Sequence, residues 1–169
     1  DKIVTSRYFQ LKLSPKHVQW PLKDDMLFDW RVPYKVIENG LESRVKLLGR
    51  IEDDELGSYY EACDIFCLPS IVKSEAFGIV QIEAMSFSKP IVATKIDGSG
   101  VDWVNKNYVS GINVNPKDSK ELVVAFNKLM SNNDIYKKYS EGSKNRFAKL
   151  FDRDIMANSI FNLYKEILK

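Results

Sequence analysis

Strand-like runs alternate with helical patterns from about residue 44 onward, and this alternation constrains the fold more than any other feature. Two mostly apolar runs, 64–68 and 91–94, are predicted to be buried strands. Shorter strands are expected at 3–5, 44–48 and 111–114. Continuous apolar strands are typical of sheets covered on both faces, and strands that alternate with helices imply βαβ units. The sequence predicts an α/β fold: a Rossmann-like, doubly wound parallel sheet followed by C-terminal helices.

Helices are expected between and after these strands. Asp53 is a suitable cap for a helix that runs to about residue 62. A second helix is predicted over 77–87, because apolar residues recur there at helical spacing. Asp118 is expected to cap a helix over 120–131. A short helix at 101–105 and two closing helices near 134–150 and 153–168 complete the pattern, whereas 13–36 has no clear period.

Length and composition suit one soluble domain. The chain has 169 residues and a net charge of +2, which is too small to indicate a nucleic-acid partner. No apolar run is long enough to span a bilayer. Cys63 and Cys67 lie in an apolar stretch and are predicted to be buried thiols. His17 is the only histidine, so histidine-based triads have little support and a multi-histidine metal site is excluded.

Three loops follow predicted parallel strands. They carry Gly49-Arg50, the segment up to Glu75, and Gly98-Ser99-Gly100. Ligands of open α/β sheets bind beyond the carboxyl ends of the strands. Topology therefore predicts that these three loops form one binding site.

Glu75 and Glu83 are the strongest candidates for contacts with a ligand. Glu75 precedes the helix predicted at 77–87 and Glu83 lies within it. A helix N-terminus favours phosphate, and Gly78 in the first turn would let a ligand approach the backbone. Each carboxylate can accept hydrogen bonds from vicinal hydroxyls. The alternative is that Glu75 caps the helix and Glu83 faces solvent.

Small residues and cations supply candidate phosphate contacts. Gly98, Ser99 and Gly100 follow a buried strand and could form a phosphate nest, or a plain turn between strand and helix. Arg7 and Lys12 follow the first strand and could neutralise a diphosphate, or could be ordinary surface charges.

The order and spacing of these elements resemble the C-terminal domain of retaining glycosyltransferases of the GT-B fold (glycosyl transferases group 1, family 4 type). The matching stretch runs from about residue 45 to 114, and the helical tail agrees. It is carried by Leu47-Leu48-Gly49-Arg50-Ile51, Ala62-Cys63-Asp64-Ile65-Phe66-Cys67-Leu68-Pro69-Ser70, Glu75-Ala76-Phe77-Gly78, Glu83-Ala84-Met85, Lys89-Pro90-Ile91-Val92-Ala93-Thr94, Gly98-Ser99-Gly100 and Ser110-Gly111. The interval from Glu75 to Glu83 matches the family's E-x7-E motif.

The resemblance implies a role for each matching residue. Glu75 would be the catalytic residue that contacts the donor sugar, and Glu83 would bind the donor ribose. The remaining donor-binding residues would hold the diphosphate, the sugar or the base; they are Arg7, Lys12, Gly49, Arg50, Ile51, Phe77, Gly78, Ile79, Gly98, Ser99 and Gly100.

The implied activity is retaining transfer of a hexose-type sugar from a nucleotide-diphospho-sugar, such as a UDP-sugar, to a glycan or lipid-linked acceptor. Polysaccharide or lipopolysaccharide synthesis is the expected setting, with no metal or other cofactor and no nucleic-acid partner. The location would be cytoplasmic, with peripheral association at the inner membrane face through the full-length protein. A sugar-nucleotide epimerase of similar fold and a non-catalytic nucleotide-sugar-binding module are the alternatives.

The chain departs from the family pattern before residue 45. It is interpreted as one donor-binding domain over 1–169, with an abbreviated or incomplete segment at 1–44, core motifs at 45–116 and a helical tail at 117–169. The usual Gly-rich turn between the first strand and Val45 is absent, which weakens the assignments of Arg7 and Lys12. The N-terminal acceptor domain of the fold is missing, so this fragment alone is expected to be inactive.

Overall fold

The computed structural model describes residues 3–5, 8–11 and 31–168 of the chain. These residues belong to two compact units. The larger unit comprises residues 1–5 and 57–169, and the smaller one comprises residues 6–56.

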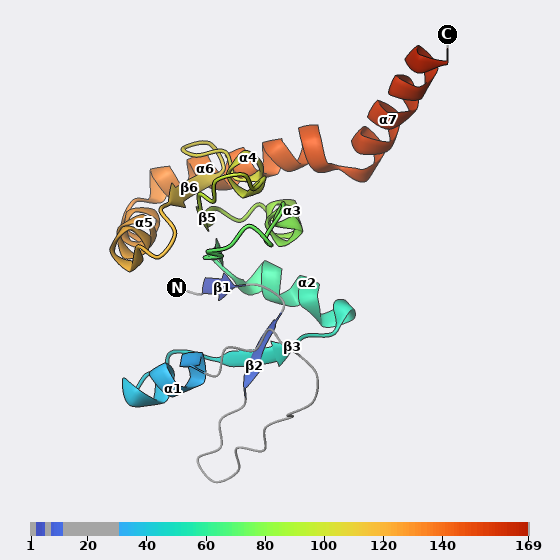
Figure 1. Ribbon diagram of the computed structural model, residues 1–169. Helices are drawn as coiled ribbons and strands as arrows, with labels where there is room; N and C mark the ends of the chain where they lie inside the picture. Colours follow the sequence, from blue (N-terminus) through green and yellow to red (C-terminus); the bar gives the residue numbers. More distant parts are fainter. Residues whose placement is uncertain (1–2, 6–7, 12–30, 169) are drawn as a thin grey trace. The chain divides into compact units, whose positions relative to one another are not determined.

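The larger unit is built on a parallel sheet (Figure 1). Its strands are β1 (Ile3–Thr5), β4 (Ile65–Leu68), β5 (Ile91–Thr94) and β6 (Gly111–Val114), in the order β1-β4-β5-β6. Every residue of β4 and β5 is buried, as expected for strands covered on both faces. The strands predicted at 3–5, 64–68, 91–94 and 111–114 are therefore confirmed.

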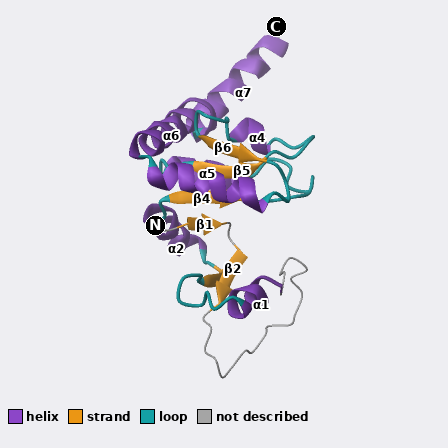
Figure 2. Ribbon diagram, turned by 90° about the vertical axis from the view of Figure 1, so that its left-hand side faces the viewer, coloured by secondary structure: helices purple, strands orange, loops and turns teal. Residues whose placement is uncertain are grey.

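One face of this sheet holds a hydrophobic cluster. Ile65, Val92, Ile112 and Val114 supply the sheet side of the cluster, and the opposing side chains are Ala125, Leu129 and Tyr139. Ala125 and Leu129 lie on α5 (Ser119–Ser131), which packs against the sheet (Figure 2), and Tyr139 lies on α6 (Asn133–Arg146). These helices therefore close this face of the sheet.

The other face is covered by different helices. Because side chains alternate along a strand, Phe66 and Leu68 point away from Ile65. Phe66 meets the ring of Tyr60 on α2 (Asp53–Ala62), with ring centroids 5.8 Å apart. Leu68 reaches Gly78, which precedes α3 (Ile79–Ser86). Helices thus cover both faces, and the predicted α/β class is confirmed.

Helix α3 begins two residues later than the period of its apolar residues predicts. Gly78 is its N-cap and has a φ of 72°, in the left-handed region. A residue in this conformation cannot lie inside a right-handed helix. The prediction that Gly78 lies in the first turn is therefore wrong, and Phe77 lies outside the helix.

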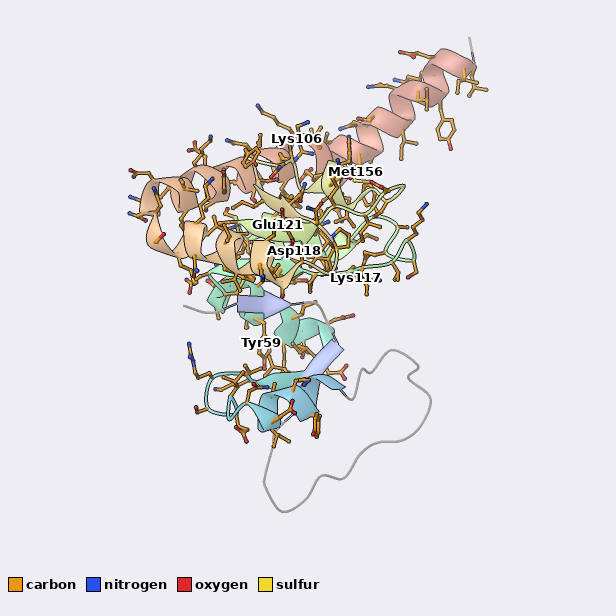
Figure 3. The ribbon with its side chains drawn as sticks, turned by 60° about the vertical axis from the view of Figure 1, so that its left-hand side comes forward. Tyr59, Lys106, Lys117, Asp118, Glu121 and Met156 are labelled. Atoms are coloured by element: carbon orange, nitrogen blue, oxygen red, sulfur yellow. The ribbon has the colours of Figure 1, made fainter. Side chains whose placement is uncertain are left out.

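The helices of the C-terminal half agree closely with the sequence patterns. The side chain of Asp118 accepts a hydrogen bond from the backbone N–H of Glu121 at 2.9 Å, which confirms the predicted cap of α5 (Figure 3). The predicted helix at 134–150 is observed as α6 followed by a π-helical turn at Phe147–Phe151. The last helix, α7, extends over Arg153–Ile167.

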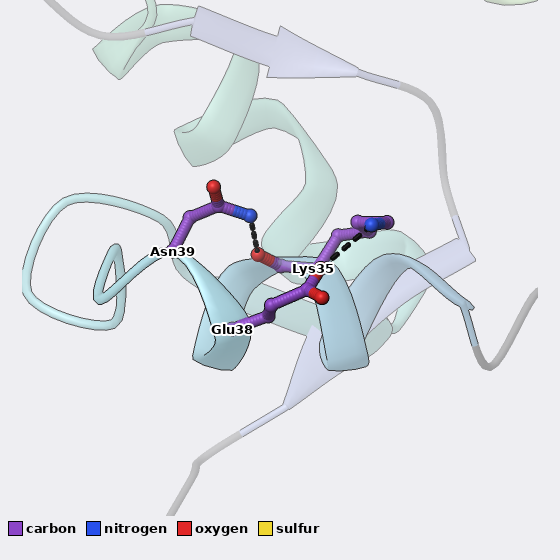
Figure 4. A network of polar contacts seen from close by, with 3 residues as sticks. All are labelled: Lys35, Glu38 and Asn39. Carbon is purple, nitrogen blue, oxygen red and sulfur yellow. Dashed lines mark hydrogen bonds and ion pairs between the residues drawn. The ribbon is translucent and has the colours of Figure 1, made fainter.

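The smaller unit contains β2 (Tyr8–Leu11), α1 (Arg31–Glu38) and β3 (Leu47–Arg50), and α2 begins in it. Lys35 on α1 pairs with Glu38 at 2.6 Å, and the Asn39 amide donates to the Lys35 carbonyl at 2.8 Å (Figure 4). The same carbonyl accepts from the backbone N–H of Asn39 at 3.2 Å, so Asn39 binds the helix end through both its backbone and its side chain.

Strand β3 differs from its prediction in bounds and in partner. It covers 47–50 instead of 44–48 and pairs antiparallel with β2, in a separate two-stranded sheet. The prediction that β3 belongs to the parallel sheet is therefore wrong. The side-chain pattern of a strand does not encode which backbone supplies its hydrogen bonds.

Both cysteines of the larger unit are buried free thiols, as predicted. Among the described residues, no helix is long and apolar enough to cross a membrane.

Candidate functional site

Two loops of the larger unit are tied together at the carboxyl ends of β4 and β5. The Ser99 hydroxyl donates to the backbone oxygen of Glu75 at 2.5 Å, and the N–H of Gly100 donates to the backbone oxygen of Ala76 at 2.7 Å. The same Ser99 oxygen accepts from the N–H of Val101 at 3.2 Å. The structure therefore brings Glu75 and the Gly98–Gly100 turn together, as the topology of the sheet predicts.

Glycine is required on both sides of Ser99. Gly98 has a φ of 76°, which strains other residues. A Cβ on Gly100 would lie 2.7 Å from Cδ2 of Phe77 and 3.2 Å from the oxygen of Ala76. The glycine at position 100 therefore permits the close approach of the two loops.

The Glu75 carboxylate is half-buried and is held by the loop that follows β4. The Ser70 hydroxyl donates to Oε2 of Glu75 at 3.3 Å. The Thr94 hydroxyl at the end of β5 in turn donates to the backbone oxygen of Ser70. No side chain caps α3, so the alternative that Glu75 caps the helix is wrong.

Glu83 is the fifth residue of α3 and is also half-buried. Its Oε2 accepts a hydrogen bond from the Tyr60 hydroxyl at 2.7 Å. This distance is typical of a charge-assisted O–H···O⁻ bond. Glu83 is therefore fixed within the larger unit, and the alternative that it simply faces solvent is wrong.

The segment between the two glutamates combines a tight turn with exposed apolar groups. Gly78 is buried, and a Cβ on it would lie 2.8 Å from Cδ2 of Leu68. Phe77 is 39% exposed and packs against Trp103 with ring centroids 5.8 Å apart. Ile79, the first residue of α3, is also exposed. Apolar groups that remain exposed at a loop edge are available to a ligand or a partner.

A lysine, Lys73, lies beside the Gly98 turn. A Cβ on Gly98 would be 3.4 Å from Nζ of Lys73. Lys73 makes no ion pair with any residue that the structure describes. An ammonium group is therefore available next to the turn that was predicted to bind phosphate.

The remaining candidates lie elsewhere in the chain. Arg7 and Lys12 are outside the described residues. Gly49 and Arg50 end β3 in the smaller unit, and Ile51, which follows them, is buried. Their roles in binding a donor stay predictions.

Tyr60 and Ser70 are the functional candidates that sequence reasoning missed. A signal for Tyr60 exists, because Leu56, Tyr60 and Cys63 recur at helical spacing and mark the buried side of α2. That pattern predicts burial of the ring, but it does not predict that the hydroxyl reaches a glutamate 23 residues away.

No group of three or more His, Cys, Asp or Glu side chains suited to a metal ion occurs in 3–5, 8–11 or 31–168.

The fold and the paired loops define a class of protein. A parallel sheet with helices on both faces, and polar loops beyond its carboxyl ends, is typical of α/β domains that bind ligands at that edge. A family model described as Glycosyl transferases group 1 matches residues 31–146. The match covers more than half of the chain and spans both units, so the chain belongs to this family.

Individual relatives agree with this assignment. The chain is 35% identical over 127 residues to O-antigen chain mannosyltransferase C from Escherichia coli, covering 75% of this chain and 34% of the relative. The structure of HepE from Anabaena in complex with UDP has a TM-score of 0.72 and 26% identity, covering 80% of this chain and 36% of that one. A C-terminal domain of a group 1 family protein (LpcC) from Francisella tularensis has a TM-score of 0.64 and 25% identity, covering 73% and 62%.

These structural neighbours are glycosyltransferases of the GT-B fold, so the predicted fold class and family are confirmed. The chain spans about a third of the length of the curated relatives that it matches, 34% and 36% for two of them.

Proposed function

We propose that this chain is the donor-binding half of a retaining glycosyltransferase. It would bind a nucleotide-diphospho-sugar and support transfer of a hexose-type sugar to a glycan or lipid-linked acceptor. Surface polysaccharide or lipopolysaccharide synthesis is the proposed setting.

The observation that carries the proposal is the hydrogen-bonded junction of two loops beyond β4 and β5. Ser99 and Gly100 bind the backbone of Glu75 and Ala76, and Glu83 is held on the helix that follows. Two carboxylates, small residues and a lysine therefore belong to one compact unit, whose loops lie at the edge of the sheet where α/β domains bind ligands.

Each carboxylate has a proposed partner on the donor. Glu83 accepts hydrogen bonds from the ribose hydroxyls, and Glu75 contacts the donor sugar and positions its anomeric carbon. In the reaction, the bond between the anomeric carbon and the diphosphate oxygen breaks, and a bond to the acceptor oxygen forms on the same face of the sugar. The nucleotide diphosphate leaves with the bonding electron pair, and its departing oxygen takes the proton of the acceptor hydroxyl.

Cations are proposed to stabilise the departing diphosphate. Negative charge develops on this group as the bond breaks, and fixed positive charges lower the energy of that state. Lys73, beside Gly98, supplies such a charge within the larger unit, and Arg7 and Lys12 are proposed to add to it. In this proposal the reaction needs no metal ion.

The names of the relatives support a sugar nucleotide as the donor substrate. One is named a mannosyltransferase, and Anabaena HepE has been solved both with UDP and with UDP-glucose. An N-terminal acceptor domain of the same protein is the proposed partner. Without it, the chain binds donor but does not turn over, because the chemistry of a two-domain enzyme takes place in the closed cleft. The full-length protein is proposed to be cytoplasmic, at the inner membrane face.

The test is the Glu83→Ala variant. A thermal-shift screen with UDP-, GDP- and ADP-sugars first identifies the nucleotide, because a ligand that binds the folded state raises its stability. Calorimetry with the corresponding nucleoside diphosphate should then show that the substitution weakens binding by about 1–3 kcal/mol, the value of hydrogen bonds to a charged acceptor. An unchanged affinity would contradict the ribose assignment.

Glu141→Ala is the matched control, because Glu141 is an exposed glutamate on α6. Its affinity should equal that of the unmodified chain. Epimerisation of a UDP-sugar without acceptor would instead establish the epimerase alternative. For the longer protein that contains this domain, donor binding without transfer to any acceptor would indicate a non-catalytic binding module.

A further inference from the structure

Tyr60 is fixed by packing next to Glu83, the proposed ribose contact. The residue is 3% exposed. Its ring stacks on Phe87 with centroids 5.7 Å apart and an interplanar angle of 23°, and it tilts against Phe66 at 5.8 Å. Two aromatic contacts from different elements hold the ring, so the position of the hydroxyl is set by the core.

The hydroxyl of Tyr60 is directed at α3. It donates to Oε2 of Glu83 at 2.7 Å and lies 3.5 Å from the backbone oxygen of Val80. The shorter contact is the significant one, because hydrogen bonds weaken steeply as the distance between the oxygens grows. The rigid phenol thus binds the flexible end of the glutamate.

A glutamate on a helix surface has several rotamers, and immobilising a side chain on binding a ligand reduces affinity. A hydrogen bond from a buried donor selects one rotamer before the ligand arrives. A carboxylate can accept about four hydrogen bonds, so the bond from Tyr60 is compatible with contacts to a vicinal diol.

We propose that Tyr60 is a positioning residue that holds the Glu83 carboxylate in the orientation that accepts the ribose hydroxyls of the donor. The inference rests on the proposed function of Glu83 as the ribose contact. It explains why Glu83 would bind the ribose well: the packed phenol on α2 orients the carboxylate on α3 before the donor binds.

The test is Tyr60→Phe, which removes one oxygen and retains the ring that packs on Phe66 and Phe87. Calorimetry would use UDP and GDP, each alongside its 2′,3′-dideoxy counterpart. For whichever nucleotide binds, Tyr60→Phe should weaken binding of the ribose form by about threefold to tenfold. Binding of the dideoxy form should be the same for the variant and the unmodified chain.

Two outcomes would overturn the inference. One is an unchanged affinity for the ribose nucleotide. The other is an equal loss for the ribose and dideoxy forms, which would mean that the hydroxyl only supports the structure. Tyr59→Phe is the matched control, because Tyr59 is the neighbouring tyrosine of α2 and is less buried. Circular dichroism confirms folding of each variant.

A double-mutant cycle separates this inference from the proposed function. If Tyr60 acts through Glu83, Tyr60→Phe should have no further effect on UDP or GDP binding in the Glu83→Ala background. If Glu83→Ala alone leaves the affinity for ribose nucleotides unchanged, the proposed function of Glu83 fails. If Glu83→Ala removes the preference for ribose and Tyr60→Phe does not reduce it, only the positioning role of Tyr60 fails.

Discussion

Replacement of Gly142 by alanine tests a close contact between α6 and the backbone of Val109. In an ordinary helix interior this change is favourable by about 1 kcal/mol, because glycine has the lower helix propensity. Gly142 lies in α6, however, and a Cβ at this position would be 1.9 Å from the backbone oxygen of Val109 and 2.7 Å from its carbon. The variant is therefore expected to be less stable than the parent chain.

The size of the expected loss of stability follows from how far α6 must move to make room for the added methyl group. Non-bonded carbon and oxygen atoms essentially never approach within 3.0 Å of a Cβ, so α6 must retreat by about 1 Å. Overpacking of this kind costs about 1–3 kcal/mol. The retreat also weakens the buried bond from the Ser143 hydroxyl to the Ser110 carbonyl, now 3.0 Å long, at a cost of about 1–3 kcal/mol. After the gain in propensity, we expect a net loss of about 1–5 kcal/mol.

Urea unfolding followed by circular dichroism measures this loss. Gly57→Ala is the matched control: Gly57 also lies inside a helix, α2, and its Cβ would be 3.5 Å from Cζ of Phe87, an ordinary contact. It should be neutral or more stable by about 0.5–1 kcal/mol. If Gly142→Ala were as stable as Gly57→Ala, the close approach of α6 to Val109 would be refuted.

Two further predictions concern pH and capping. Burial raises the pKa of the Cys67 thiol from 9.0 to about 12, and burial, together with Asp64, raises that of Cys63 to about 11 against the opposing effect of Lys89. An unfolded thiol ionises near pH 9, whereas the buried thiols stay protonated to higher pH. Their contribution to the free energy of unfolding is therefore complete below pH 9. It is lost as the pH rises towards 11–12, by about 1.4 kcal/mol per pH unit for a fully buried thiol. The urea midpoint should therefore fall less between pH 7.5 and pH 10.5 in a Cys63→Ala/Cys67→Ala variant than in the unmodified chain. An equal fall in both would contradict thiol burial as the cause. Asp118→Ala should cost about 1 kcal/mol in urea unfolding because it removes the α5 cap, whereas Asp118→Asn should retain most of the stability.

Local elements of the larger unit could be predicted because their causes are local. The strands at 65–68 and 91–94 follow from apolar runs that only a covered sheet can bury. The start of α5 follows from the capping side chain of Asp118, which accepts a hydrogen bond from the N–H of Glu121 three residues later. The start of α3 could not be placed in the same way, because apolar spacing continues through Phe77 while the left-handed backbone of Gly78 prevents the helix from beginning earlier.

The candidate site also combines features that the sequence predicted with features that it did not. The sequence indicated Glu75, Glu83 and the Gly98–Gly100 turn, and the order of the strands placed two of the loops at one edge of the sheet. It wrongly assigned the strand at Leu47–Arg50 to the parallel sheet, because the partner of β3 is a strand from another part of the chain.

By itself, the sequence determined the strands of the parallel sheet and most helices of the larger unit, and that two glutamates eight residues apart flank a glycine turn. Only the tertiary structure decided that Ser99 binds the Glu75 backbone and that Tyr60 binds the Glu83 carboxylate. Periodicity and capping depend on neighbours in the chain, whereas these bonds join residues more than 20 positions apart. Such bonds exist only where packing brings the donor and the acceptor within about 3 Å of each other.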